Sequence, residues 1–148
     1  MSSSIFLSIV IPVRNEEKFI QRTLESLVNQ DFPRGRYELI VVDGRSTDLT
    51  VPIVQKFIAD HPDVNIRLVD NPGILSSRAR NIGIRMSKGQ LIGVIDGHVY
   101  IPDNQLFTNM EKFKKELVCC ALHGQHHWMC QTLTMVWHIG LQWLGRAS

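Results

Sequence analysis

The chain has 148 residues, 44% of them hydrophobic, and its 16 basic and 14 acidic side chains give a formal net charge of +2. This length allows one folded domain with a substantial core, and the apolar content excludes a disordered chain. The balanced charge argues against nucleic acid or an anionic membrane surface as a partner.

The N-terminal segment and the cysteines favour a cytoplasmic protein. Residues 5–13 form an apolar run with no basic segment before it and no small-residue cleavage site after it, so we expect a strand and not a signal peptide. The three cysteines do not make a disulfide framework, which favours a reducing compartment. The stretch nearest to a membrane span, 129–144, is interrupted by polar residues. Membrane association would therefore require a continuation beyond Ser148.

Short apolar runs alternate with amphipathic patterns from residue 7 to residue 117. We predict buried strands over 7–12, 37–42, 66–69 and 91–95. Each is followed by a predicted helix: the first with Asn15 as its N-cap, the second with Pro52 in its first turn, the third capped by Ser76 and the last over 106–117. The alternation predicts an α/β fold, a mostly parallel sheet with right-handed crossovers and flanking helices.

The end of the chain has no clear hydrophobic period. Residues 118–122 fit one more strand, and we place the boundary of the α/β domain (1–122) there, with 123–148 as an irregular or partly helical tail. The cysteines and histidines of 119–130 allow a zinc site as an alternative, but their spacing does not fit the usual pattern. The tail's tryptophans favour core packing or an interface, including self-association, over a platform for stacking sugars: Trp128, Trp137 and Trp143.

Polar side chains follow three of the predicted strands. In an open parallel sheet, ligands bind beyond the carboxyl ends of the strands, so we expect 12–16, 43–48 and 96–98 to share one edge. Asp96 and His98 suit a divalent cation, since Mg²⁺ prefers oxygen ligands and Mn²⁺ also accepts imidazole. The alternative is that Asp96 caps a turn and His98 is an ordinary surface imidazole.

The remaining polar residues of this edge suit a nucleoside diphosphate. Asp43 is placed to accept an N–H of a pyrimidine base. Arginines meet phosphate in a bidentate way, and the candidates are Arg14, Arg45, Arg78 and Arg80. Simpler structural roles compete with these: Glu16 and Glu17 suit a first helical turn, residues 46–48 are common helix caps, and arginines on helices are commonly solvated.

Four motifs in chain order carry a family resemblance: Ser-Ile-Val-Ile-Pro-Val-Arg-Asn-Glu-Glu at 8–17, Glu-Leu-Ile-Val-Val-Asp-Gly-Arg-Ser-Thr-Asp at 38–48, Ala-Arg-Asn-Ile-Gly at 79–83 and Val-Ile-Asp-Gly-His at 94–98. They resemble the successive motifs of family 2 glycosyltransferases, which have the GT-A fold. The second and fourth are most similar to the branch that builds bacterial exopolysaccharides such as succinoglycan. The resemblance covers roughly residues 5–110.

The resemblance implies a nucleotide-sugar donor, of the UDP-sugar type, and Mn²⁺ or Mg²⁺ as the cofactor. It implies transfer of a hexose to a glycan or lipid-linked acceptor in polysaccharide biosynthesis, by a metal-assisted inverting displacement. Asp43 would contact the base, and Asp96 and His98 would take the position of the metal and the diphosphate. The full set of donor-binding residues expected in this way is Pro12, Val13, Arg14, Glu16, Asp43, Arg45, Arg80 and Asp96.

The chain departs from the family pattern in three respects. The commoner motif is Asp-Asp-Gly-Ser where this chain has Asp-Gly-Arg-Ser at 43–46, so one acidic residue is replaced, and His98 stands where the metal motif commonly ends in Asp. No downstream acidic motif that would deprotonate the acceptor is found in 118–148. The catalytic base is therefore unassigned, and we expect a donor-binding half that is active only as part of a longer chain.

Two other functions compete with this interpretation. An inactive domain of the same fold would bind a nucleotide or a protein partner without transferring a sugar. A phosphoacceptor signalling domain would need paired acidic residues directly after the first strand, where this chain has Arg14.

Overall fold

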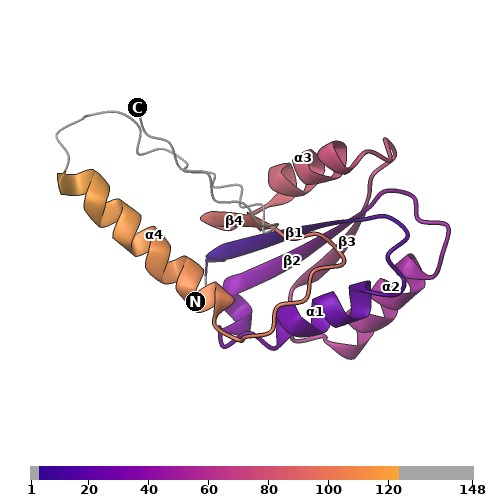
Figure 1. Ribbon diagram of the computed structural model, residues 1–148, viewed down its shortest axis with the longest axis horizontal. Coiled ribbons are helices and arrows are strands. Elements are labelled where there is room, and N and C mark those ends of the chain that lie inside the picture. The colour runs from indigo at the N-terminus through magenta and orange to yellow at the C-terminus, as the bar shows by residue number, and fades with distance from the viewer. Residues whose placement is uncertain (1–3, 124–148) are drawn as a thin grey trace.

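Four parallel strands in the order β3-β2-β1-β4 form the sheet of this protein, as seen in a computed structural model that describes residues 4–123 (Figure 1). The strands are β1 (Leu7–Val13), β2 (Tyr37–Asp43), β3 (Ile66–Asp70) and β4 (Leu91–Val94). The helices are α1 (Ile20–Val28), the short 3₁₀ helix η1 (Arg34–Arg36), α2 (Thr50–Asp60), α3 (Ser76–Met86) and α4 (Leu106–His123).

The two central strands are buried along their whole length. All seven residues of β1 and all seven of β2 are buried, as their nearly unbroken apolar sequences require when helices cover both faces of a sheet. On one face, Ile9 and Val41 pack in a large core with α1, α2 and the start of α4. On the other, Val10 and Ile40 pack against α3 through a smaller cluster that includes Ala79 (Figure 1).

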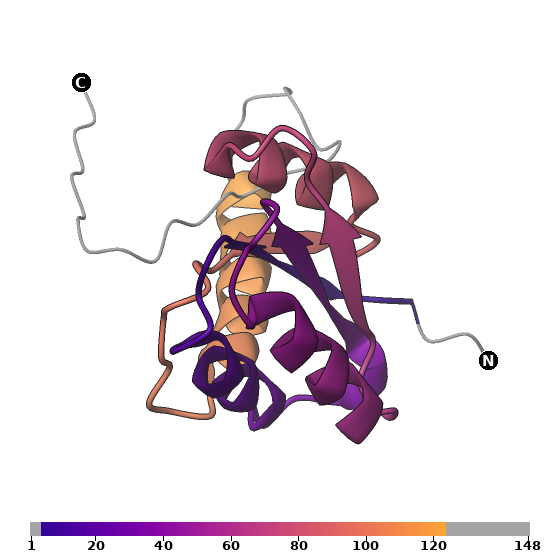
Figure 2. The same ribbon diagram turned by 90° about the vertical axis from the view of Figure 1, so that its right-hand side faces the viewer.

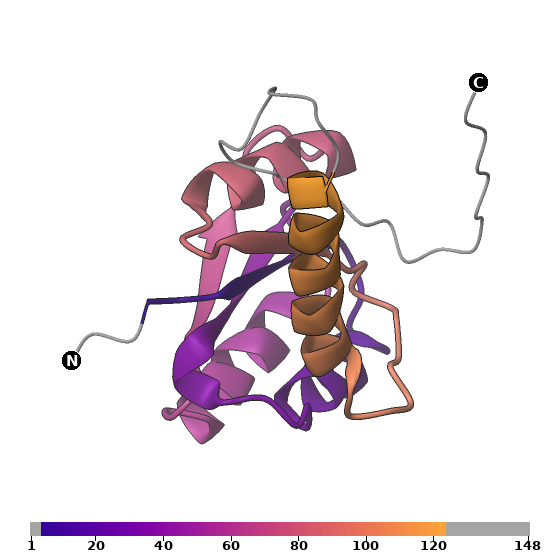
Figure 3. The same ribbon diagram turned by 90° about the vertical axis from the view of Figure 1, so that its left-hand side faces the viewer.

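The start of α4 is fixed by a group of aromatic rings. Phe107 is fully buried and meets Phe32 edge to face, with ring centroids 6.0 Å apart, and Tyr37 at 5.0 Å. From there α4 runs along the β4 side of the molecule, in front of the sheet in Figure 3. The aromatic contacts tie α4 to the core that also holds Phe32 and β2.

The strand order creates a switch point between β1 and β4. The chain steps outward from β1 to β2 and β3, and then crosses back so that β4 pairs with the free side of β1. A crevice is expected at such a point, beyond the carboxyl ends of the strands. That edge lies at the right of Figure 1 and faces the viewer in Figure 2.

The predicted α/β fold with a parallel sheet is confirmed, and all four strands occur within one residue of the predicted bounds. Three local predictions are wrong. Asn15 does not cap α1, which begins only at Ile20; Asn15 has a positive φ of 55° and lies in the preceding turn. Ser76 lies inside α3, which has no side-chain cap. Residues 118–122 are helical, because α4 continues through them.

The predictions for the tail, 124–148, lie outside the described residues, including those for the tryptophans and for the histidines and Cys130. Within residues 4–123, none of the helices has the length and hydropathy needed to span a membrane.

A buried carboxylate braces the amino-terminal half of the sheet. Glu38, on β2, is fully buried, and its Oε1 accepts hydrogen bonds from Ser8 Oγ at 2.6 Å and from the amide of Lys88 at 2.7 Å. Its Oε2 accepts from Arg67 Nη2 at 2.7 Å, and Arg67 also donates to the carbonyl of Met86. One side chain thus joins β1, β2 and β3 to the turn that leads into β4.

We expect Glu38→Gln to lower the free energy of unfolding by about 3 kcal/mol, because it breaks a buried ion pair and turns an amide donor toward groups that are themselves donors. Urea denaturation would measure the loss. Asp63→Asn is the matched control, since its ion pair with Arg34 is exposed on both sides, and it should cost less than about 1 kcal/mol. Equal losses in the two variants would contradict the bracing role.

Candidate functional site: the carboxyl edge of the sheet

The loops after β1, β2 and β4 meet around the end of β1. The amide of Gly44 donates to the carbonyl of Val13 at 2.8 Å, which joins the first two loops. A Cβ added to Gly97 would lie 2.6 Å from Val13 Cγ1, so the third loop approaches as closely as glycine allows. Asp43 precedes Gly44 and Asp96 precedes Gly97. The fold therefore brings both carboxylates to the two sides of Val13.

The loop after β1 is bound to the loop after β2 through a ladder of side-chain hydrogen bonds. The amide of Asn15 donates to Ser46 Oγ at 2.9 Å, and Asn15 Oδ1 accepts from the amide of Thr47 at 2.8 Å. The amide of Glu16 donates to Thr50 Oγ1 at 2.8 Å. These bonds satisfy amides that would otherwise face solvent, and they fix the position of the two loops relative to each other.

The ladder continues through an acidic residue on each loop. Asp48 Oδ2 accepts from the amide of Glu17 at 3.1 Å, while Glu17 Oε2 accepts from the amide of Leu49 at 3.0 Å. Asp48 Oδ1 also accepts from Thr50, from its hydroxyl at 2.6 Å and its amide at 3.0 Å. Asp48 and Glu17 therefore brace the start of α2. Glu17 does not lie in the first turn of α1, which begins at Ile20.

Asp43 shapes the second loop from inside. Its side chain is buried, and both carboxylate oxygens accept hydrogen bonds from Ser46, at 2.5 Å from Oγ and at 3.0 Å and 3.3 Å from the amide. A carboxylate oxygen can accept more than one hydrogen bond, so these bonds leave capacity for a further donor at the rim. The contact between Asp43 and a base remains a prediction.

Asp96 is paired with Arg80 from the opposite face of the sheet. Arg80, on α3, places Nη2 3.1 Å from Asp96 Oδ1, and both side chains are about one-third exposed or less. Arg80 Nε is buried and has no hydrogen-bond partner among residues 4–123. An unpaired buried donor is costly, so an acceptor oxygen arriving here would be stabilised.

His98 contacts Glu16 instead of Asp96. Its Nδ1 lies 3.0 Å from Glu16 Oε1, and its side chain is more than half exposed. This contact connects the β4 loop to the β1 loop a second time. Glu16, which the sequence predicts only as one of the donor-binding residues, is therefore placed beside the candidate metal position.

The other predicted site residues differ in accessibility. Pro12 and Val13 are buried within β1, and the side chain of Val13 lies against Gly97. The side chains of Arg14 and Arg45 are exposed, and neither makes an ion pair or a hydrogen bond with the described residues 4–123. The side chain of Arg78 lies over Gly73, where an added Cβ would come within 2.3 Å of Arg78 Cδ.

Strained backbone is concentrated at this edge. Among the described residues, the non-glycine residues with positive φ are Asn15 at 55°, Arg45 at 58° and Ile74 at 65°, one in each loop after β1, β2 and β3. A β-branched residue such as Ile74 rarely adopts this conformation. Such strain persists only where surrounding contacts impose it, and it is typical of functional sites.

Two polar residues that sequence reasoning missed hold the loops in place. Asn71 is fully buried, and its backbone amide donates to the carbonyl of Asp43 at 2.8 Å. Its side chain accepts a hydrogen bond from the amide of Gly73 and donates one to the carbonyl of Leu75. Thr23, on α1, donates from Oγ1 to the carbonyl of Gly97 at 2.8 Å. The Asn-Pro-Gly sequence signals a turn, but the burial of Asn71 and the reach of Thr23 have no sequence signal.

The donor set at this edge fits a divalent cation only in part. Asp96 offers an oxygen and His98 a nitrogen, a combination that Mn²⁺ accepts more readily than Mg²⁺. Within residues 4–123, no three acidic, histidine or cysteine side chains cluster closely enough to hold a metal alone. A cation bound here would therefore take its other ligands from water and from an oxygen-rich ligand such as a diphosphate.

Comparisons with known proteins point to one family. The family model for glycosyl transferase family 2 matches residues 8–140. The dolichyl N-acetyl-alpha-D-glucosaminyl phosphate 3-beta-D-2,3-diacetamido-2,3-dideoxy-beta-D-glucuronosyltransferase of Methanococcus voltae is 34% identical over 110 residues, which are 74% of this chain and 34% of that protein.

Two solved structures show a similar fold. Staphylococcus aureus TarS in complex with UDP has a TM-score of 0.66 at 30% identity, over 76% of this chain and 32% of that one. The Pyrobaculum calidifontis mannosyltransferase PcManGT in complex with GDP-Man and Mn²⁺ has a TM-score of 0.70 at 28% identity, over 75% of this chain and 32% of that one. The chain therefore spans about a third of the Methanococcus voltae and Pyrobaculum calidifontis proteins and 19% of the full length of TarS, of which that structure contains residues 1–349.

The ladder between the first two loops should depend on pH through Asp48. Desolvation raises the pKa of Asp48, but hydrogen bonds from Thr50 and from the amide of Glu17 outweigh it, so the pKa lies below its ordinary value. A carboxyl group with a lowered folded-state pKa stabilises the fold above its unfolded pKa of about 3.9, and this stabilisation is lost as pH falls through the folded value.

Asp48→Asn should therefore unfold more easily than wild type at neutral pH and lose less stability than wild type as pH falls below about 4. Urea denaturation at a series of pH values would measure both effects. Parallel pH profiles for the two proteins would contradict the role given to Asp48.

Proposed function

Since the chain belongs to glycosyltransferase family 2, we propose that it forms the donor-binding part of an enzyme that transfers a sugar from a nucleotide-diphospho-sugar to a glycan or lipid-linked acceptor. The observation that carries the proposal is the delivery of Asp43 and Asp96 to the two sides of the end of β1, at the switch point of a parallel sheet. The motifs after β2 and β4 favour the exopolysaccharide branch of the family.

The nucleoside would lie over the first two loops. Asp43 accepts an N–H of the base, for which a uracil ring is suited, and the ladder that holds Asn15 to the second loop prevents the two loops from separating. We therefore favour a UDP-sugar over other nucleotide-sugar donors. The neighbours solved with UDP and with GDP-Man support a nucleoside diphosphate as part of the donor.

The diphosphate would lie between Asp96 and the arginines of the edge. Arg80 offers the unpaired Nε, and the exposed guanidinium groups of Arg14 and Arg45 offer further bidentate donors. The ion pair between Arg80 and Asp96 holds the carboxylate in place before a ligand arrives. Binding would then exchange one contact of Arg80 for phosphate oxygens without leaving a buried charge unpaired.

Asp96 and His98 would hold the cation, with Glu16 orienting the imidazole through Nδ1. A bound Mn²⁺ or Mg²⁺ neutralises the charge that develops on a departing diphosphate. This chain's own residues fix where that charge develops, since Gly97 is packed on Val13 and bonded to Thr23. The inverting step needs a base for the acceptor hydroxyl, and none of the described side chains is assigned that role.

We expect wild-type protein to bind UDP in the presence of Mn²⁺ with an affinity that falls at least about tenfold when EDTA is added or when Asp96 is replaced by Ala. Isothermal titration calorimetry measures this directly, and GDP serves as the competing base. Asp60→Ala, at the far end of α2, is the control and should bind like wild type. Equal affinity of wild type and Asp96→Ala would refute the role of Asp96, and tighter binding of GDP would refute the choice of base.

A further inference from the structure

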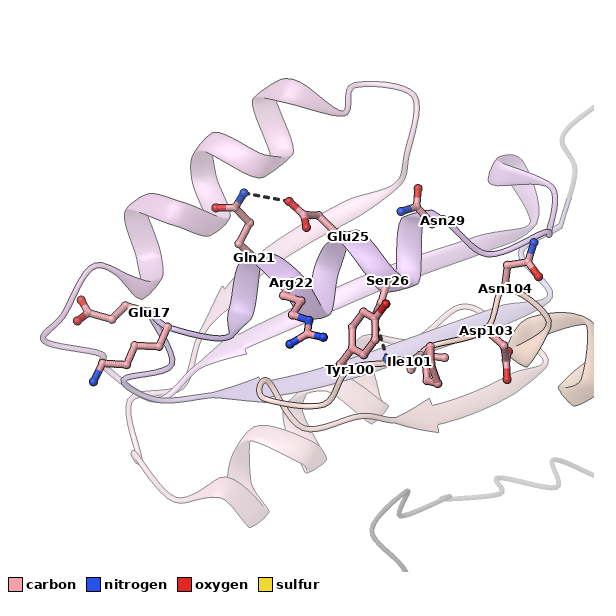
Figure 4. A pocket seen from close by; sticks show the side chains of 12 residues that line it. Glu17, Gln21, Arg22, Glu25, Ser26, Asn29, Tyr100, Ile101, Asp103 and Asn104 are labelled. Carbon is pink, nitrogen blue, oxygen red and sulfur yellow. Dashed lines mark hydrogen bonds between the residues drawn. The ribbon is translucent and has the colours of Figure 1, made fainter.

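A separate groove of about 750 Å³ lies beside the donor edge, between α1 and the segment that follows His98. One wall is formed by α1 and its flanking residues, from Glu17 to Asn29, and the other is the segment Tyr100–Asn104 (Figure 4). Glu17 and Lys18, at the end of the loop after β1, contribute to the groove, but Asp43, Asp96 and His98 do not line it. Among its lining side chains, Glu17 alone has a role described above, in the ladder between the first two loops.

The walls of the groove are fixed to each other by hydrogen bonds along its length. Ser26 Oγ accepts from the amide of Ile101 at 3.4 Å, and Gln30 Nε2 donates to the carbonyl of Asp103 at 2.8 Å. Beyond α1, the amide of Asp31 donates to the carbonyl of Asn104 at 2.7 Å. The segment 100–104 is therefore held against α1, and a ligand would find the groove largely pre-formed.

The lining combines one aromatic ring with many hydrogen-bond donors and acceptors. Tyr100 is 49% exposed, and the guanidinium carbon of Arg22 lies 4.0 Å from the centre of its ring, which holds the ring at the groove (Figure 4). Gln21 donates to Glu25 at 2.9 Å, and further polar groups line the groove: Lys18, Asn29, Asp103 and Asn104.

The charge and polarity of this lining favour some classes of ligand over others. Its two cationic side chains are balanced by three carboxylates, so it has no excess positive charge to attract a phosphate or an anionic membrane. It also lacks the apolar stripe that would accept an amphipathic helix. A half-exposed tyrosine among amides, carboxylates and cations suits a ligand with both apolar C–H faces and many hydroxyl groups, which describes a saccharide.

Both walls of the groove follow closely along the chain from residues of the candidate metal position. Tyr100 follows His98 by two residues, and Glu17 follows Glu16, the residue that contacts His98 at 3.0 Å. From that end the groove runs along α1 toward Asn29 and Asn104. A chain of sugar units lying in it would have one end next to the position where the donor's diphosphate is placed.

We propose that this groove binds the acceptor glycan, with Tyr100 as its stacking surface and Arg22 as the residue that holds the ring in position. The inference rests on the proposed function for the identity of its ligand as an acceptor, but the binding of a saccharide does not depend on nucleotide. It adds to the donor site a specific path for an oligosaccharide along α1.

Saturation-transfer difference NMR tests the proposal with cellotetraose and chitotetraose as probes, in the absence of nucleotide and metal. Wild-type protein should transfer magnetisation to the ring protons of at least one probe. Tyr100→Ala should reduce the affinity at least about fivefold, since it removes the stacking surface, and Tyr100→Phe should retain most of it. Phe19→Ala is the matched control, because Phe19 is 51% exposed at the start of α1 and does not line the groove.

The two sites are separated by measuring UDP binding in the same variants. Tyr100→Ala and Phe19→Ala should keep the wild-type affinity for UDP with Mn²⁺ and the wild-type melting temperature. Absence of transfer to both probes, or equal saccharide binding by wild type and Tyr100→Ala, would overturn the groove proposal. Failure of UDP binding with intact saccharide binding would instead overturn the proposed donor site and leave a glycan-binding groove.

Discussion

Everything at the functional edge depends on β1 being paired on both sides with parallel strands from distant parts of the chain. Val13 aligns with Asp43 on β2, and Val10 aligns with Val94 on β4, two residues before Asp96. A slip of one residue in either pairing would turn every buried side chain of these strands to the wrong face. The hydrophobic core on the two faces of β1 therefore fixes the register, and the register places the carboxylates.

The polar residues of the edge divide into those that build it and those left available to a ligand. Ser46, Thr47 and Asp48 are consumed by hydrogen bonds to the first loop, and the positive φ angles of Asn15 and Arg45 are imposed by that ladder. The guanidinium groups of Arg14 and Arg45 remain exposed. The strained backbone at Asn15 and Arg45 is thus part of a rigid pair of loops. Because the loops are rigid, their arginine side chains can contact a charged ligand without a rearrangement of the backbone.

The sequence predicted the strands well because a strand buried on both faces has a continuous apolar signature, as β1 and β2 do. The prediction for the start of α1 is wrong, because Asn15 accepts a hydrogen bond from the amide of Thr47 instead of capping the helix. Such a contact depends on a loop about thirty residues away in the chain, which local sequence does not reveal. For the same reason, the contact between His98 and Glu16, which lie 82 residues apart, could not be predicted from the sequence. Sequence motifs identified which residues gather at the edge, and tertiary contacts decided which of them touch.

The segment after β4 links the donor edge to the groove along α1. Gly97 is packed against Val13 on one side and receives a hydrogen bond from Thr23 on the other, and Ile101 is bonded to Ser26 three residues further along α1. The candidate metal position and the wall of the groove therefore belong to one short stretch of backbone, held by the sheet and by a single helix. A transferase must keep its two substrates in a fixed relative position, because a displacement of about 1 Å can cost a hundredfold in rate. Placing both positions on one doubly anchored segment satisfies that requirement without a mobile domain, which is the physical reason to look for the acceptor on the α1 side of His98.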